Sequence, residues 1–457
     1  MVNITDRDCH FYLEVISFIR SLFSISTMKI IECQRLKHFF LIGVLLSSLI
    51  GCNRAANNSD ELEFWTMQLK PNFTQYFANL NSTYESQHEV ELRWIDIPWS
   101  AMENKILTSI SAKTAPDVVN LNPKFASQLA TNNAWLDLEP AISPEVKETY
   151  LPKIWQASTI EVCQESQCND QTFGIPWYLT TTITIYNQEL LTTSNIEVPQ
   201  TYQQLASAAK TIKEKTGKYA FFTTFVPSDS GDVLESLVKM GVELIDDSGK
   251  AAFDTPEGKA AFQYWVDLYR QDLLPPEVLT QGHRRGIELY QAGEVALLAS
   301  GAEFIDSITK NAPTVAEVSG VAPQITGKTD KKSVAVMNLV IPRSTERSQQ
   351  ALEYALYVTN TENQLTFARE SNVFPSTVEA VERYIQDIEQ QEQTSLKEQA
   401  KKISASQLKD AEVLIPVRED IQVLQKAIYE NLQAAMLDEK TVEQAVEDAA
   451  GEWNSRQ

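Results

Sequence analysis

62-LEFWTM-67, 90-VELRWIDI-97 and 117-DVVNLN-122 are three short runs rich in apolar and β-branched residues, and we interpret each as a β-strand. Amphipathic helical patterns over residues 72–87 and 99–113 separate these runs. The order strand, helix, strand, helix, strand is typical of an α/β fold with parallel strands. Ligands of such folds bind beside the carboxyl ends of the strands, so the polar and aromatic residues that follow each run are candidate ligand contacts.

Length and composition indicate a globular protein with more than one core. The chain has 457 residues, of which 43% are hydrophobic, and this length suggests two lobes or two domains. Its formal net charge is −22. Nucleic acid and anionic lipid are therefore poor partners, because the chain would be repelled by both.

The stretch 41-LIGVLLSSLIGC-52 is apolar, uncharged and close to the N-terminus. Lys29, Arg35 and Lys37 precede it, and small residues end it. The apolar run over residues 39–51 is shorter than the roughly 20 residues that a membrane-spanning helix needs. This order of charged, apolar and small residues predicts a secretory signal over residues 1–51.

The four residues 49-LIGC-52 resemble the bacterial lipobox. That resemblance implies cleavage before Cys52 and acylation of its thiol, with residues 52–61 as a polar tether. A buried core helix is the alternative for the apolar stretch. Met28 is a more natural start than Met1, so we interpret residues 1–27 as an over-extended start.

Two cysteines, Cys163 and Cys168, lie beyond the predicted signal and lipidation site. In an oxidising compartment they predict one disulfide that closes a small polar loop. A metal pair or a redox motif is the alternative, but the spacing is not C-x-x-C and the chain has only four histidines. We therefore predict no metal site.

Six segments, taken together and in order, resemble the family 1 extracellular solute-binding proteins of ABC importers, a class that includes carbohydrate-binding lipoproteins. They are 115-APDVVNLNPKFASQLATNNAWLDLEP-140, 174-GIPWYLTTTITIYNQELL-191, 199-PQTYQQLASAAKTIKEKTGKYAF-221, 254-DTPEGKAAFQYWVDLY-269, 290-YQAGEVALLASGAEF-304 and 372-NVFPST-377. The resemblance implies an α/β, two-lobed periplasmic-binding-protein-like fold of type II. Each lobe would be a mainly parallel sheet flanked by helices, and a hinge would join the lobes.

The resemblance also implies how the chain divides. We expect lobe 1 to contain residues 62–187 and 338–405, and lobe 2 to contain residues 188–337 and 406–457. The chain would cross between lobes near residues 186–188 and again near Met337 and Asn338.

The function implied is reversible binding of a carbohydrate, such as a mono- or oligosaccharide or a polyol, between lobes that close on it. A monomer anchored by its lipid would then deliver the solute to the transmembrane subunits of an ABC permease, without a cofactor and without catalysis. The alternatives are a secreted, lipid-anchored carbohydrate-active enzyme with two carboxylates, and a sugar sensor. The sequence has no G-x-S-x-G, H-E-x-x-H or phosphate-loop motif.

A carbohydrate site needs aromatic rings for the apolar sugar faces, with amides and carboxylates for the hydroxyls. Such residues occur at the expected strand ends and in the segments that resemble the family. The candidate ligand-binding residues are Gln68, Asp96, Trp99, Asn122, Trp177, Tyr178, Asp229, Glu303, Asn338 and Phe374. We assign Trp65 and Trp155 to packing. Where many sugar-binding members have a tryptophan, this chain has Phe304, which can stack but cannot donate a hydrogen bond.

Overall fold

The computed structural model describes residues 61–164, 167–392, 395–408, 410–418 and 420–456. The predicted signal, the tether and the lipidation site at Cys52 lie outside these residues. Within the described part of the chain, no helix combines the length and the apolarity that crossing a bilayer requires.

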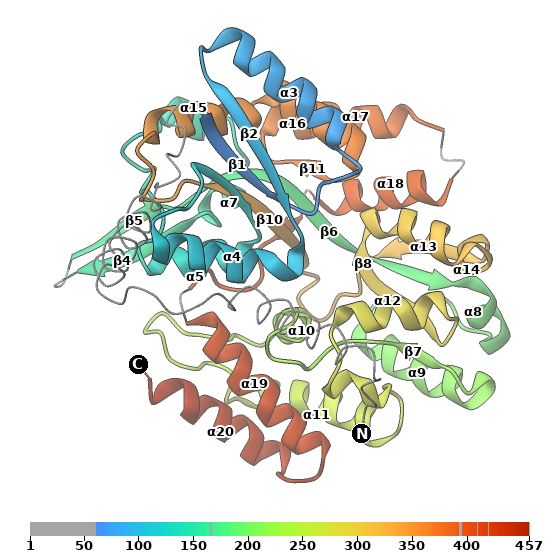
Figure 1. Ribbon diagram of the computed structural model, residues 1–457. Coiled ribbons are helices and arrows are strands. Elements are labelled where there is room, and N and C mark those ends of the chain that lie inside the picture. The colour runs from blue at the N-terminus through green and yellow to red at the C-terminus, as the bar shows by residue number, and fades with distance from the viewer. Residues whose placement is uncertain (1–60, 165–166, 393–394, 409, 419, 457) are drawn as a thin grey trace, which may run out of the picture. The chain divides into compact units, whose positions relative to one another are not determined.

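The described chain alternates strands with helices (Figure 1). The strands are β1 (Glu61–Met67), β2 (Glu91–Ile97), β3 (Val118–Leu121), β4 (Thr159–Gln164), β5 (Gln167–Thr172), β6 (Ile175–Asn187), β7 (Tyr219–Phe221), β8 (Val295–Gly301), β9 (Ser319–Pro323), β10 (Lys332–Val340), β11 (Phe374–Pro375) and β12 (Ala411–Glu412). The helices before β8 are α3 (Thr74–Gln87), α4 (Trp99–Ala112), α5 (Pro123–Thr131), α6 (Pro144–Lys147), α7 (Pro152–Gln156), α8 (Gln188–Ser194), α9 (Tyr202–Thr216), α10 (Asp232–Lys239), α11 (Pro256–Arg270), the 3-10 helix η1 (Pro276–Leu279) and α12 (His283–Gln291). After β8 come the 3-10 helix η2 (Ala302–Phe304), α13 (Ile305–Asn311), α14 (Pro313–Glu317), α15 (Ser348–Val358), α16 (Thr361–Ser371), α17 (Val378–Gln390), α18 (Leu396–Leu408), α19 (Ile421–Met436) and α20 (Val442–Asn454).

The strand and helix series predicted over residues 62–122 is confirmed. Strand β1 pairs in parallel with β2 on one side and with β3 on the other. The register places Thr66 of β1 opposite Asp96 of β2. The carboxyl ends of these strands therefore lie at one edge of the sheet, as parallel pairing requires.

The sheet is mixed rather than mainly parallel, which corrects that detail of the expected fold. The main path of strands runs β2, β1, β3, β10, β6, β8, β7. Strand β10 is antiparallel to both β3 and β6, and β6 is antiparallel to β8 and β9. Strand β10 thus runs against β1, β2 and β3, strand β6 runs against β8 and β7, and the two long strands run against each other.

Helices cover both faces of the first part of the sheet (Figure 1). On one face the ring of Phe64 packs 6.1 Å from Phe77 of α3 and 5.3 Å from Tyr354 of α15, measured between ring centroids. On the other face the ammonium group of Lys105 from α4 lies 4.5 Å from the ring centroid of Trp65. Alternation of side chains along β1 produces this division.

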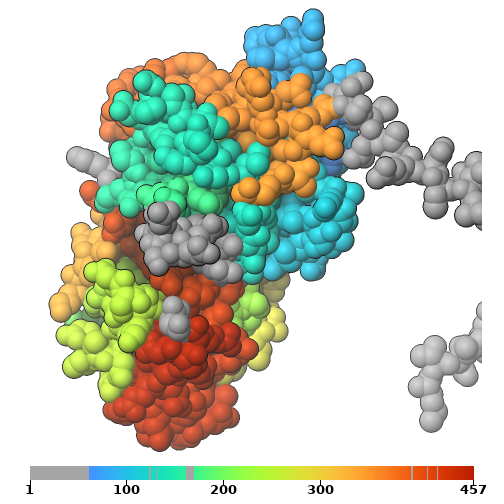
Figure 2. All heavy atoms as spheres, turned by 90° about the vertical axis from the view of Figure 1, so that its left-hand side faces the viewer, coloured from blue at the N-terminus to red at the C-terminus, as the bar shows by residue number. Residues whose placement is uncertain are grey.

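The two largest hydrophobic clusters use separate stretches of the chain. One contains buried residues from 62–178 and 337–373, and the other contains buried residues from 191–297 and 421–453. Figure 2 shows the red C-terminal helices beside the yellow-green residues of the second cluster, although the two are distant in sequence. The lobe boundaries given above remain a prediction.

Local sequence signals account for the helix ends. Thr201 and Gln204 form a reciprocal capping box at the start of α9, and Gly217 ends that helix with a φ of 72°, a left-handed conformation that glycine adopts readily. Helix α11 is capped by the side chain of Thr255 rather than by the preceding Asp254.

Candidate ligand-binding site

The predicted contact Asp96 holds the loop between β1 and α3. Its Oδ1 accepts hydrogen bonds from the Thr66 hydroxyl at 2.7 Å and the Leu69 backbone N–H at 2.9 Å, and its Oδ2 accepts from the Lys70 N–H at 2.9 Å. Both carboxylate oxygens are therefore engaged by the protein itself. The principal role of Asp96 in this structure is to fix the loop that carries Gln68.

Gln68 and Trp99 meet at the exposed end of the same edge. Gln68 has a φ of 53°, and its Oε1 accepts a 3.4 Å hydrogen bond from the backbone N–H of Trp99, the first residue of α4. The Trp99 side chain is 43% exposed, which is unusual for a ring of this size. An exposed indole with an amide beside it has the composition that a sugar-binding surface needs.

Tyr178, on strand β6, lies near carboxylates that come from distant parts of the chain. Its side chain is buried, and burial together with the negative charges of Glu303 and Asp96 raises the pKa of its hydroxyl. The influence of both carboxylates on one hydroxyl indicates that Glu303, which follows β8, and Asp96, near the end of β2, both lie close to Tyr178.

The carboxyl group of Glu303 folds back over Gly301. A Cβ atom at Gly301 would lie only 2.1 Å from Oε2 and 2.2 Å from Oε1 of Glu303, so glycine at this position makes room for the carboxyl group. Burial raises the pKa of Glu303 from 4.5 to about 7. Near neutral pH this group therefore titrates.

Asp229 and His283 form a second polar group, which comes from the other side of the site. Asp229 Oδ1 accepts a 2.8 Å hydrogen bond from the backbone N–H of His283, and the absence of a side chain at Gly282 leaves space for that carboxylate. The His283 ring lies 3.3 Å from the Ser300 hydroxyl through Nε2, and its centroid is 6.3 Å from that of Phe304.

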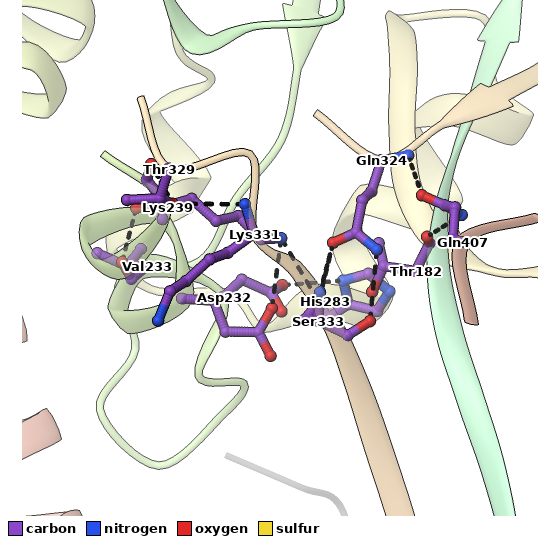
Figure 3. A network of polar contacts seen from close by, with 12 residues as sticks. Thr182, Asp232, Val233, Lys239, His283, Gln324, Thr329, Lys331, Ser333 and Gln407 are labelled. Atoms are coloured by element: carbon purple, nitrogen blue, oxygen red, sulfur yellow. Dashed lines mark hydrogen bonds and ion pairs between the residues drawn. The ribbon is translucent and has the colours of Figure 1, made fainter. Parts of the chain in front are cut away.

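His283 is the residue that sequence reasoning missed. Its Nδ1 is 3.7 Å from a carboxylate oxygen of Asp232, and its side chain keeps 28% exposure (Figure 3). No motif surrounds it in the sequence. The one sequence feature that marks His283 is its position after a glycine at the start of a helix. This feature is too common to indicate a binding residue.

Trp177 lies in the core, not in a loop that lines the site. It is fully buried, and its ring stacks on Phe367 at 5.0 Å and packs near Phe64 and Phe77. No face of the ring is left for a ligand. We therefore remove Trp177 from the candidate contacts.

Three further candidates are engaged in structural contacts. Asn122 caps α5 by accepting a hydrogen bond from the Phe125 N–H at 2.9 Å. Asn338 is 1% exposed, and its Oδ1 accepts from the Ser158 hydroxyl at 2.5 Å. Phe374 is 2% exposed and packs against Tyr384. Asn338 and Phe374 nevertheless lie on strands beside Tyr178, because the adjacent residues, Met337 and Pro375, are its pairing partners.

The backbone places Cys163 opposite Cys168 across the β4–β5 hairpin. Their side chains lie outside the described parts, so the disulfide stays a prediction. Over the residues that the structure does describe, no group of three or more His, Cys, Asp or Glu side chains is arranged to hold a metal ion.

We predict that Glu303→Gln changes the pH dependence of stability. From pH 4.5 to about 7 the folded protein holds the Glu303 proton more tightly than the unfolded chain does, so ionisation lowers stability as the pH rises through this window. A glutamine side chain at this position cannot ionise, so the Glu303→Gln variant does not lose stability in this way. Its melting temperature relative to the wild type should rise across the window and level off above it.

Thermal unfolding at a series of pH values checks this. Glu382→Gln, which removes an exposed carboxylate on α17, is the matched control and should show no such trend. Parallel wild-type and Glu303→Gln profiles would mean that Glu303 ionises as it does in water.

Comparison with known proteins agrees with this architecture. The family model for bacterial extracellular solute-binding proteins matches residues 68–365. A crystal structure named as a candidate oligosaccharide periplasmic-binding protein from Synechococcus sp. MITs9220, in complex with zinc, is 42% identical with a TM-score of 0.81, over 86% of this chain and 98% of that one.

More distant relatives share the fold. The galactooligosaccharide-binding protein of Bacillus subtilis is 21% identical over 355 residues, which are 74% of this chain and 79% of the relative. The structure of maltose-bound MalE3 from T. maritima is 20% identical, with a TM-score of 0.69 over 87% of this chain and 100% of that one. From the family match, which covers more than half of the sequence, this chain belongs to the bacterial extracellular solute-binding proteins.

Proposed function

We propose that this protein is the solute-binding component of an ABC importer and that it binds a carbohydrate around Tyr178. The observation that carries the proposal is the convergence on this tyrosine of groups from both halves of the fold. Asp96, whose loop carries Gln68 beside Trp99, approaches from one half, and Glu303 approaches from the other.

The chemistry of these groups suits a saccharide. An exposed indole can cover an apolar sugar face, and amide and carboxylate oxygens can accept hydrogen bonds from hydroxyls. The relatives support the same ligand class, because two of them are named for oligosaccharide or galactooligosaccharide binding. Since the family consists of binding proteins, we propose capture and release rather than catalysis.

Closure of the fold around the ligand completes the proposal. A ligand that contacts both halves stabilises the conformation in which both sets of contacts are made, and it shifts the population toward that conformation. The closed protein would dock on the permease, with Cys52 as its lipid anchor.

We expect a saccharide to raise the melting temperature of the protein from residue 53 onward. A ligand that binds only the folded state stabilises it by about 2.7 kcal/mol at a concentration of 100 times Kd. The measurement is thermal unfolding against a panel of oligosaccharides, monosaccharides, polyols and amino acids, with the ligand recovered afterwards. Recovery of a cleaved glycoside would favour the enzyme, and a panel without any effect would remove the support for carbohydrate binding.

We further expect the site to discriminate against anionic sugars. Asp96 and Glu303 lie near Tyr178, and Asp229 and Asp232 lie against His283, whereas Lys239 is buried against Glu235. A uronic acid should bind roughly tenfold or more weakly than the matching neutral sugar, because a like charge at a desolvated site costs at least about 1.4 kcal/mol.

Calorimetric titration of one neutral and uronic pair measures this difference. Glu303→Gln should reduce the difference in affinity between the neutral and the uronic sugar. The exposed-site control Glu382→Gln should leave that difference unchanged. Equal affinities for the pair would contradict a negative site.

We expect the wild-type chain to take up labelled palmitate in a bacterial host and Cys52→Ala to take up none. The physical reason is that the lipidation proposed here requires the thiol at residue 52. Cys33→Ala, which removes an upstream cysteine of the predicted signal, is the control and should be labelled normally. Labelling of Cys52→Ala would place the acyl group elsewhere.

A further inference from the structure

Strand β6 changes its partners at Thr182. Before this residue β6 pairs with β10 and β11, and the last such pair joins Thr181 to Val334. From Thr182 onward it pairs with β8 and β9, and the first such pairs join Thr182 to Gly301 and Ile183 to Pro323. The single strand is therefore held by one set of neighbours in its first half and by another in its second half.

Two glutamine side chains make hydrogen bonds at this change of partners. Gln407 of α18 donates from Nε2 to the carbonyl oxygen of Thr182 at 3.2 Å, and its Oε1 accepts from the backbone N–H of Gln324 at 2.8 Å. Figure 3 shows Gln407 between the two backbone segments. Gln407 is 2% exposed, so these bonds do not compete with water.

The side chain of Gln324 extends the same connection to β10. Its Oε1 accepts from the backbone N–H of Ser333 at 2.8 Å, and its Nε2 donates to the Ser333 carbonyl oxygen at 3.3 Å. This pair of bonds to the N–H and the carbonyl group of one residue is the pattern that a residue of a neighbouring antiparallel strand makes. The amide of Gln324 thus acts as a strand neighbour for β10.

Ser333 is also contacted by Lys239 of α10, which is buried and forms an ion pair with the partly exposed Glu235 of the same helix. The ammonium group of Lys239 lies 3.4 Å from the Ser333 hydroxyl and 3.6 Å from Glu235, and Lys239 is 5% exposed (Figure 3). A Cβ at Gly327, in the turn before β10, would lie 2.3 Å from the Lys239 carbonyl oxygen. The start of β10 is therefore tied closely to α10.

Helix α18, which carries Gln407, contacts both sides of the change of partners. Its Ala405 and Leu408 pack in a cluster with Val334 of β10, whereas its Ala400 packs in a different cluster with Ile183 of β6. A relative movement of these two clusters would have to displace α18 or strain the bonds of Gln407.

We propose that Gln324 and Gln407 are positioning residues for lobe closure, and that they fix its pivot at Thr182. The proposal rests on the proposed function, since a pivot matters when the ligand is held between moving parts. Hinges are short segments that absorb changes of backbone angle, and directional hydrogen bonds at such a segment restrict the changes available to it. Without Gln407, the Thr182 carbonyl group would lose a buried partner.

Three variants of the full chain in mild detergent test the pivot. Gln324→Leu and Gln407→Leu remove the bonds at similar side-chain volume. Gln407→Glu keeps an acceptor for the Gln324 backbone N–H but loses the donor to the Thr182 carbonyl oxygen. This variant replaces a leucine variant that fails to fold. Amide hydrogen exchange is followed without ligand, and affinity is measured with a galacto-oligosaccharide mixture as the probe.

The matched control is Gln364→Leu. Gln364 is also buried and also joins two segments, since its Nε2 donates to the Thr359 carbonyl oxygen at 2.6 Å and its Oε1 accepts from the Ser376 hydroxyl at 3.1 Å. Among the described residues, Gln364, Thr359 and Ser376 make no hydrogen bond to Thr182, β9 or β10, whereas the Ser376 hydroxyl lies 2.7 Å from the Pro176 carbonyl oxygen at the start of β6. The control should lower the melting temperature and leave the affinity within about twofold, because its lost hydrogen bonds are not those made where β6 changes partners.

In the pivot variants we expect exchange around residues 180–184 and 333–335 to rise about tenfold, which corresponds to the loss of one hydrogen bond. Affinity should fall by roughly 2- to 30-fold, the range found for residues that modulate coupling without touching ligand. Variants that lose thermal stability as the control does, with unchanged affinity, would show a structural role only and would overturn the proposal.

If the wild-type protein binds no saccharide, the proposed function fails by itself. The proposed pivot is then tested by amide hydrogen exchange without an affinity measurement. Faster exchange confined to the two segments around Thr182 supports it, and faster exchange spread over both cores or absent from both segments overturns it.

Discussion

The rest of the structure depends on the continuity of strand β6. Its 13 residues, Ile175–Asn187, span roughly 40 Å at the rise of an extended strand. Leu179 packs in one hydrophobic cluster and Ile183 and Ile185 pack in another, so a single strand serves separate cores. One core cannot move relative to the other without bending β6. The strand bends most easily at Thr182, where its neighbouring strands change.

The candidate site uses the same strand. Tyr178 lies four residues before Thr182 on β6. Thr182 pairs with Gly301, the last residue of β8, so Glu303, two residues later, lies near this part of β6. Strand register therefore sets the distance of the ligand-binding groups from the point of bending. Groups so close to a pivot move little relative to it, whereas exposed groups such as Trp99 on α4 move further. A ligand that contacts both kinds of group would favour one lobe angle over others.

Sequence predicted the fold better than the site, for physical reasons. The alternation of strand and helix over residues 62–122 is written in local periodicity, and the structure reproduces it. Trp177 was misplaced because the Gly-Ile-Pro segment before it resembles a turn, yet Trp177 is the third residue of a buried strand. Successive strand side chains alternate in direction, so of the pair Trp177 and Tyr178 only the tyrosine approaches Glu303.

Other features of the site depend on contacts that no local pattern encodes. The three donors to Asp96 come from strand β1 and the loop after it, 26 to 30 residues earlier. His283 approaches Phe304 because β8 connects α12 to η2. The mixed direction of the sheet likewise arises from β6 and β10. Their apolar sequences do not distinguish parallel from antiparallel pairing.

The carboxylates of the site differ in what a ligand can offer them. Asp96 and Asp229 already accept backbone N–H groups, whereas in the described part of the chain Glu303 has only its own backbone N–H as a donor. Burial raises its pKa because this one donor does not offset the loss of water. A sugar hydroxyl would supply that donor and favour the ionised form. Ligand and proton would therefore compete for Glu303 below about pH 7, and binding would strengthen as the pH rises toward that value.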